Sequence, residues 1–217
     1  MSDGLASYWN IRLEALKTAL EKNRFGAHVV RTANEAGQLV LKDMLPNLKP
    51  RTISWGDSMT MTATGVLDAL RKNKRYELIV TFDATVPRPE LLERRRQALL
   101  SDVFMTGSNA VTESGQLVNL DMVGNRVAGI TFGPRNVILF IGRNKLVTNL
   151  DAAKDRIKNY AAPANIIRHD FKTPCAKTGR CMDCASPQRI CNTWTVTEKS
   201  FPPGRIQIIL INQDLGL

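Results

Sequence analysis

All four cysteines of this 217-residue chain lie in one short segment. They are Cys175, Cys181, Cys184 and Cys191, in the spacing C-x5-C-x2-C-x6-C. A C-x2-C step lets two thiolates reach one ion, and four thiolates are the ligand set of structural zinc and of iron–sulfur clusters. Residues 174–192 therefore predict a metal centre held by four cysteines, either a 4Fe-4S iron–sulfur cluster or zinc.

The spacing leaves the metal open. It matches neither the two C-x2-C knuckles of a zinc ribbon nor the tighter cysteine run of bacterial ferredoxins. Two disulfides or four free cysteines are the alternatives. Disulfides need an oxidising compartment, and residues 1–17 contain no apolar signal core. We therefore favour a cytoplasmic protein with a metal or cluster centre.

A second group of residues predicts a site for an anion. Residues 54–58, Ser-Trp-Gly-Asp-Ser, join an expected strand end to a helix start, where backbone N–H groups and hydroxyls could hold a phosphate or carboxylate. Arg126 and Lys145 follow turn residues at expected strand edges and carry charges that bind carboxylates. Ordinary helix capping and solvated surface charge are the alternatives. The predicted anion-binding residues are Ser54, Gly56, Asp57, Ser58, Asn109, Arg126 and Lys145.

Glu113 is the candidate catalytic residue. It lies in an expected tight turn between two strands, two residues before Gly115. A carboxylate in such a turn could attack an acyl group or act as a base, although most acidic turn residues are only solvated. His28 and His169 are far apart in the sequence and lack a nearby nucleophile pattern, so neither is given a catalytic role.

The charge balance indicates anionic partners. The chain has 30 Lys and Arg against 20 Asp and Glu, a net charge of +10. Such a charge favours a small molecule with a carboxylate or phosphate, or an acidic redox protein. The basic clusters at 71–75 and 94–96 lack aromatic residues placed to stack on bases, which argues against a nucleic-acid partner. No apolar run approaches the ~20 residues that span a bilayer.

The order of expected elements predicts the fold class. Strands and helices alternate in the first half, which favours an α/β fold with a mostly parallel sheet flanked by helices and a ligand site at the carboxyl ends of its strands. Short strands between 107 and 142 indicate a smaller β-rich lobe. We expect one domain over 1–217 that contains the cysteine loop. Helices are expected over 4–22, 34–45 (ending before Pro46), 60–72, 89–100 and 150–161, and strands over 28–30, 52–55, 77–82, 103–105, 110–112, 116–118, 126–128, 137–141 and 206–211.

The order of motifs resembles the LUD (lactate-utilisation) domain family, in particular proteins similar to lactate utilisation protein C. The resemblance rests on residues 106–119 (TGSNAVTESGQLVN), 124–127 (GNRV) and 142–145 (GRNK), with 54–58 and the cysteine loop. It covers essentially the whole chain. It implies a fold related to ribose-5-phosphate isomerase and the coenzyme A transferases, and a link to the oxidation of lactate to pyruvate in iron–sulfur protein complexes.

These observations support one leading hypothesis and two alternatives. The first is electron transfer through the cysteine-bound centre in organic-acid oxidation, as a subunit of a complex, since the chain has no flavin or dinucleotide fingerprint. The second is an acyl or coenzyme A transferase-like or ligase-like enzyme. For it, the Thr-Glu-Ser-Gly turn at Glu113 resembles the Glu-Asn-Gly turn of coenzyme A transferases, with Ser in place of Asn. The third is a zinc-dependent nucleic-acid-binding or redox-sensing module.

Overall fold

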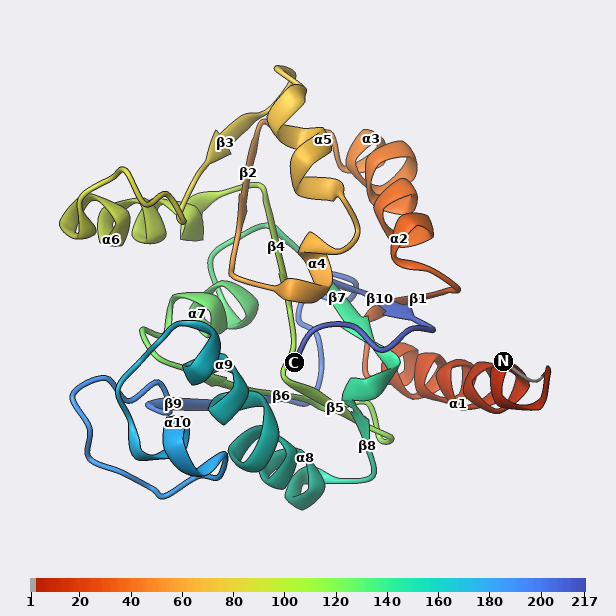
Figure 1. Ribbon diagram of the computed structural model, residues 1–217. Coiled ribbons are helices and arrows are strands. Elements are labelled where there is room, and N and C mark those ends of the chain that lie inside the picture. The colour runs from red at the N-terminus through yellow and green to blue at the C-terminus, as the bar shows by residue number, and fades with distance from the viewer. Residues whose placement is uncertain (1–2) are drawn as a thin grey trace.

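A computed structural model describes residues 3–217 and shows two β-sheets with helices packed around them (Figure 1). The larger sheet has six parallel strands in the order β1-β10-β7-β4-β2-β3, and the smaller has four in the order β8-β5-β6-β9. The predicted α/β fold class, with a mostly parallel sheet and a smaller β-rich lobe, is confirmed. The strands are β1 (Gly26–Val30), β2 (Thr52–Trp55), β3 (Glu77–Ile79), β4 (Val103–Gly107), β5 (Ala110–Thr112), β6 (Leu117–Asp121), β7 (Asn136–Gly142), β8 (Leu146–Val147), β9 (Thr193–Thr197) and β10 (Ile206–Ile211).

The central strand β7 explains why the larger sheet is covered on both faces. Its residues after Asn136 are all buried and almost all apolar, which is typical of a parallel strand between two layers of helices. Ile138 and Phe140 pack into one core, whereas Val137, Leu139 and Ile141 pack into another. This alternation follows from the two-residue period of a strand. Helix α1 (Asp3–Lys22) contributes its apolar stripe to the second core.

Two helices run further than the sequence predicted, because each passes a proline through a widened turn. The helix expected to stop before Pro46 continues from α2 (Ala33–Leu39) through a π-helical turn at Val40–Met44 into α3 (Leu45–Leu48). A proline has no N–H and crowds the carbonyl four residues earlier, and the wider turn before it accommodates both effects. A second π-helical turn, at Ile157–Ala161, joins α8 (Leu150–Arg156) to α9 (Ala162–Arg168), which contains Pro163.

The strand expected over 126–128 is wrong, because these residues form the first turn of α7 (Asn125–Thr131). Val127 and Ile130 favour strands locally, but both are buried three residues apart, which is the spacing of one helical face. Gly124, at φ 92°, provides the left-handed conformation from which the helix begins. In addition, β9 was not predicted. The remaining helices are α4 (Met59–Thr62), α5 (Val66–Lys72), α6 (Arg88–Gln97) and α10 (Pro174–Thr178), with 3-10 turns at Ala98–Leu100 and Arg143–Lys145.

Between residues 3 and 217, no helix has both the length and the apolar character that a membrane crossing requires.

Candidate functional site

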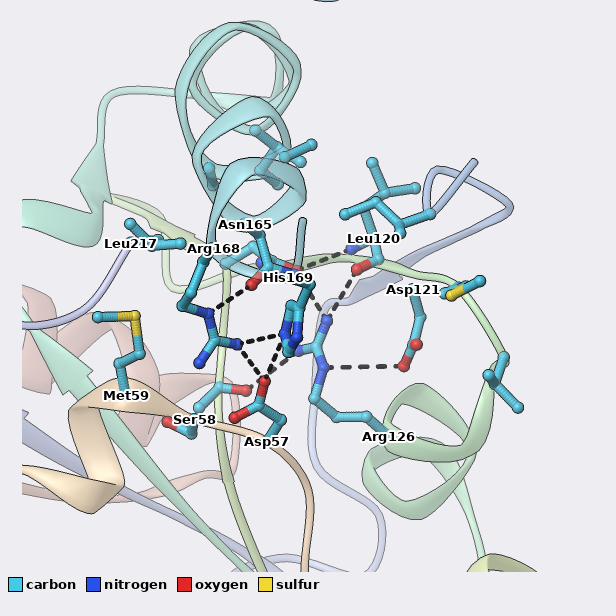
Figure 2. A pocket seen from close by; sticks show the side chains of 18 of the residues that line it. Asp57, Ser58, Met59, Leu120, Asp121, Arg126, Asn165, Arg168, His169 and Leu217 are labelled. Atoms are coloured by element: carbon cyan, nitrogen blue, oxygen red, sulfur yellow. Dashed lines mark hydrogen bonds and ion pairs between the residues drawn. The ribbon is translucent and has the colours of Figure 1, made fainter. Parts of the chain in front are cut away.

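A pocket of about 430 Å³ opens at the carboxyl ends of β2 and β4, between the larger sheet and the smaller one (Figure 2). Loops of parallel strands gather at this edge, which is the usual place for a ligand. The segment after β2 supplies Asp57 and Ser58, and residues 107–109 follow from the end of β4. Arg126 comes from α7, and Arg168 and His169 come from the end of α9.

The structure brings five of the predicted anion-binding residues to this pocket and places two behind it. The pocket is lined by Asp57, Ser58, Asn109, Arg126 and Lys145. Ser54 is fully buried, and its hydroxyl donates to the carbonyl of Ile79 at 2.8 Å. Gly56 permits a close approach, because a Cβ there would lie 2.8 Å from Thr106 Oγ1 and 3.2 Å from Arg126 Cγ.

Ser58, which follows β2, lies close to Gly107 at the end of β4. Ser58 Oγ accepts a hydrogen bond from the Met61 N–H at 3.2 Å, so Ser58 caps the short helix α4. A Cβ on Gly107 would lie 2.7 Å from Ser58 Oγ, closer than real contacts allow. Both residues therefore shape the pocket, and the Ser58 hydroxyl serves as a helix cap.

Arg126 is largely buried, and its guanidinium forms hydrogen bonds to several segments of the pocket wall. Nη1 donates to Gly107 O at 3.2 Å and to Asn119 Oδ1 at 2.7 Å. Nη2 donates to Asn109 Oδ1 at 2.9 Å and to Leu120 O at 2.8 Å. Nε lies 3.7 Å from an Asp121 carboxylate oxygen. Because these donors are directed at protein acceptors, Arg126 contributes positive charge to the pocket while its main contacts are structural.

Burial affects this guanidinium as well. Its side chain is 13% exposed. Removal from water lowers the pKa of Arg126, whereas the carboxylates of Asp121 and Asp57 raise it. An arginine remains protonated at neutral pH under such conditions, so a permanent positive charge lies in the pocket wall.

Lys145 is the most deeply buried charged side chain of the pocket, at 5% exposed. Its ammonium donates to Thr60 Oγ1 at 2.9 Å. Burial, followed by the nearby charges of Arg156 and Arg126, lowers the pKa of Lys145 to about 7. An amine with this pKa can act as an acid, a base or a nucleophile near neutral pH.

The sequence did not predict three further residues of the pocket, Arg95, Arg168 and His169. Arg168 donates to the Asp57 carboxylate, and His169 Nε2 lies 3.4 Å from the same group. Figure 2 shows both side chains pointing from α9 toward Asp57 and Ser58. They were missed because the helix was expected to end at 161, before Pro163. The third is Arg95, which was assigned to a solvated cluster.

Arg95 differs from the other arginines of the pocket. Its guanidinium lies over the Phe82 ring, 5.2 Å from the centroid. Its Nε is buried, yet it has no hydrogen-bond partner within residues 3–217. A buried donor without an acceptor is costly, and this one belongs to a side chain that lines the pocket. The Nε itself is covered by protein atoms, so the rest of the Arg95 side chain is what faces the pocket.

Glu113 does not line this pocket. Its carboxylate pairs with Arg12 of α1, and half of its side chain is exposed. The turn itself is as expected, with Gly115 at φ 80° and its N–H donating to Thr112 O at 2.8 Å. The structure therefore separates the candidate catalytic glutamate from the predicted anion-binding residues.

The cysteine loop lies beside α9, between α10 and β9 (Figure 1). All four cysteines are free thiols. Burial, followed by the charge of Cys181 and then those of Cys175 and Cys184, raises the pKa of the Cys191 thiol to about 11, while Arg189 acts in the opposite direction. The four sulfurs are thus within electrostatic reach of each other. However, no three Cys, His, Asp or Glu side chains in the described part of the chain are arranged to hold a metal ion.

The backbone of the loop is organised around Cys181 and Arg189. The Asp183 N–H donates to Cys181 Sγ at 3.5 Å, a contact of the kind that supports metal-bound thiolates. Arg189 donates to the carbonyls of Cys184 and Cys191. Four thiolates would suit zinc or an iron–sulfur cluster. In this structure, however, the four thiols are not positioned around one ion.

The loop and the pocket share a wall. Ile190, next to Cys191, and Phe171 both line the pocket. They belong to the same apolar cluster as Cys175 and Cys191. A change in the position of the cysteine loop would therefore reach the pocket through Ile190.

Comparison with known proteins places this architecture in a family. Among curated proteins, none matches the chain. A crystal structure of a DUF162 family protein from Deinococcus radiodurans is similar over 94% of this chain and 98% of that one, with 14% identity and a TM-score of 0.49. The LUD domain model matches residues 13–211, a range that contains both sheets, the cysteine loop and all of the pocket lining except Leu217. The chain therefore belongs to the LUD domain family.

Proposed function

We propose that this protein binds a small organic acid in the pocket and carries a zinc or iron–sulfur centre in the cysteine loop. With these two sites it would take part in the oxidation of organic acids. The observation that carries the proposal is Arg95, whose guanidinium lines the pocket, lies over the Phe82 ring and has no carboxylate partner among residues 3–217. A carboxylate is the natural partner of a guanidinium, because its two oxygens match the spacing of the N–H donors.

The charges around Arg95 support an anionic ligand. Arg126, Lys145 and Arg168 also line the pocket. Two aspartates, Asp57 and Asp121, oppose them, and they already contact Arg168 and Arg126 respectively. The cations therefore outnumber the carboxylates that could neutralise them, which favours a bound anion.

The test is anion binding by wild-type protein and by Arg95→Met, measured by calorimetry with lactate and pyruvate. Loss of a charge-assisted pair costs about 1.5–3 kcal/mol, so we expect affinity to fall by about tenfold or more. Arg96→Met is the matched control, because Arg96 is its exposed neighbour on α6 and pairs with Glu93. Equal binding by wild-type and Arg95→Met proteins would contradict the proposal, as would wild-type protein that binds neither acid at millimolar concentration.

The second part of the proposal concerns the cysteine loop. When bound, an iron–sulfur cluster would supply one-electron transfer, whereas zinc would supply only structure. Conversion of a hydroxy acid to an oxo acid releases two electrons and two protons, so a cluster would need an external acceptor. An acidic redox protein fits the net charge of +10, because opposite charge accelerates encounter. The unpaired thiols support a reducing, cytoplasmic setting.

Anaerobically purified protein is expected to contain iron with acid-labile sulfide, or zinc, and to lose it in Cys184→Ser. Few large apolar side chains hold residues 174–192, so loss of the centre should increase proteolysis there before the sheets unfold. Metal analysis and limited proteolysis make the measurement, and Ser186→Ala, in the same loop, is the control. Metal-free wild-type protein with a loop as resistant as that of the variant would contradict this part.

A further inference from the structure

Lys145 is a buried amine without a carboxylate partner. It lines the pocket, it is 5% exposed, and no ion pair to Asp or Glu forms within 4.0 Å in the described chain. Buried lysines are almost always paired, since an isolated ammonium loses its hydration on burial. The proposed function does not require this feature, because a surface lysine would supply the same charge to an anion.

The surroundings of Lys145 hold the amine in place and keep it electropositive. Thr60 Oγ1 donates to Leu215 O at 3.0 Å, so the same oxygen accepts from Lys145 Nζ. Arg156 is anchored beside it, with Nε donating to Asn144 O at 3.0 Å and Nη1 donating to Asn109 O at 2.8 Å. One hydrogen bond to a side chain therefore orients the amine of Lys145 at the pocket wall.

The charged groups that face Lys145 are Arg156 from the end of α8 and Arg126 from α7, and both favour the neutral amine. With burial, they lower the pKa of Lys145 to about 7, so about half of the amine is neutral at pH 7. An exposed lysine is neutral in only about one part in three thousand at this pH. A neutral primary amine is the nucleophile that forms imines with ketones and aldehydes.

We propose that Lys145 forms an imine with a ketone or aldehyde that carries a carboxylate, a 2-oxo acid in the simplest case. This inference rests on the proposed function, since the cations of the pocket would bind the carboxylate. The nitrogen lone pair attacks the carbonyl carbon, the carbon–oxygen double bond opens, and the carbinolamine loses its oxygen as water together with two hydrogens of the amine. The reaction therefore needs no oxidant, reductant or further reactant.

The test is reductive trapping. Wild-type protein is incubated with pyruvate and sodium cyanoborohydride, which reduces an imine to a stable secondary amine, and the label is located by peptide mass mapping. We expect label on Lys145, with formation rising through pH 7 as the amine loses its proton. Acetone, which has no carboxylate, should label Lys145 much less at equal concentration.

Two variants complete the test. Lys145→Arg keeps the charge but cannot form the imine, so it should lose nearly all of the label. Lys154→Arg removes an exposed lysine of α8 and should leave labelling unchanged. Label spread over exposed lysines, or equal labelling of Lys145→Arg, would overturn the inference. Lactate cannot form an imine, so wild-type protein that binds lactate by calorimetry but gives no adduct would overturn this inference and leave the proposed function standing.

Discussion

Replacement of Arg126 by methionine is expected to lower the free energy of unfolding by about 4 kcal/mol or more, the largest effect among the pocket residues. The substitution removes the guanidinium donor from the carbonyls of Gly107 and Leu120 and from two amide oxygens, each of which keeps one backbone N–H donor: Leu120 N–H for Asn109 and Asn109 N–H for Asn119. Each buried group that loses its partner costs about 1–3 kcal/mol, and removal of one member of a buried ion pair costs about 3–5 kcal/mol. Chemical denaturation measures the difference.

A second variant tests whether the loss of stability comes from the geometry of the guanidinium or from its charge, and an exposed arginine provides the control. Arg126→Lys should recover little of the loss, because one ammonium cannot replace a planar fork that reaches both walls. Arg135→Met is the control: Arg135 has a side chain 83% exposed and a surface ion pair to Asp102, so it should change stability by less than about 1 kcal/mol. A fully stable Arg126→Met protein would show that the pocket walls are held by other contacts.

The larger sheet could be predicted because its signal is local and strong. The apolar run of β7 and the alternation of strands with amphipathic helices each determine one element and its neighbours without knowledge of distant residues. The position of the pocket then followed from the rule for parallel strands. This is why Asp57, Ser58 and Asn109, which follow strand ends or join strands, were assigned to one site.

The parts that were missed depend on tertiary contacts. The β-branched Val127 favoured a strand over 126–128, but packing of Val127 and Ile130 against the core selects a helix. Likewise, the helix was expected to end at 161, before Pro163. A π-helical turn lets it continue instead, and this places Arg168 and His169 at the pocket. No sequence rule distinguishes Arg95 from its neighbours. In the structure Arg94 and Arg96 pair with glutamates of their own helix, whereas Arg95 lies over the Phe82 ring and lines the pocket.

Neutralisation of Lys145 offers a test of burial that is independent of any ligand. The amine has an ordinary pKa of 10.5 in the unfolded chain and about 7 in the folded protein. Between these values the unfolded state binds the proton that the folded state has lost, so stability should rise with pH. Below pH 7 both states are protonated, and the folded protein bears the full cost of a buried charge.

The Lys145→Met variant is therefore expected to be more stable than the wild type at pH 6, by on the order of 5 kcal/mol. The difference should shrink as pH rises from 7 and fall to about 1 kcal/mol at pH 10, where the amine is neutral in the folded protein but still mostly protonated in the unfolded chain. Urea denaturation of both proteins from pH 6 to pH 10 makes the measurement. Lys154→Met, an exposed change on α8, should follow the wild-type curve. Parallel curves for wild type and Lys145→Met would mean that Lys145 keeps its proton in the folded protein, by drawing water or a carboxylate to the pocket.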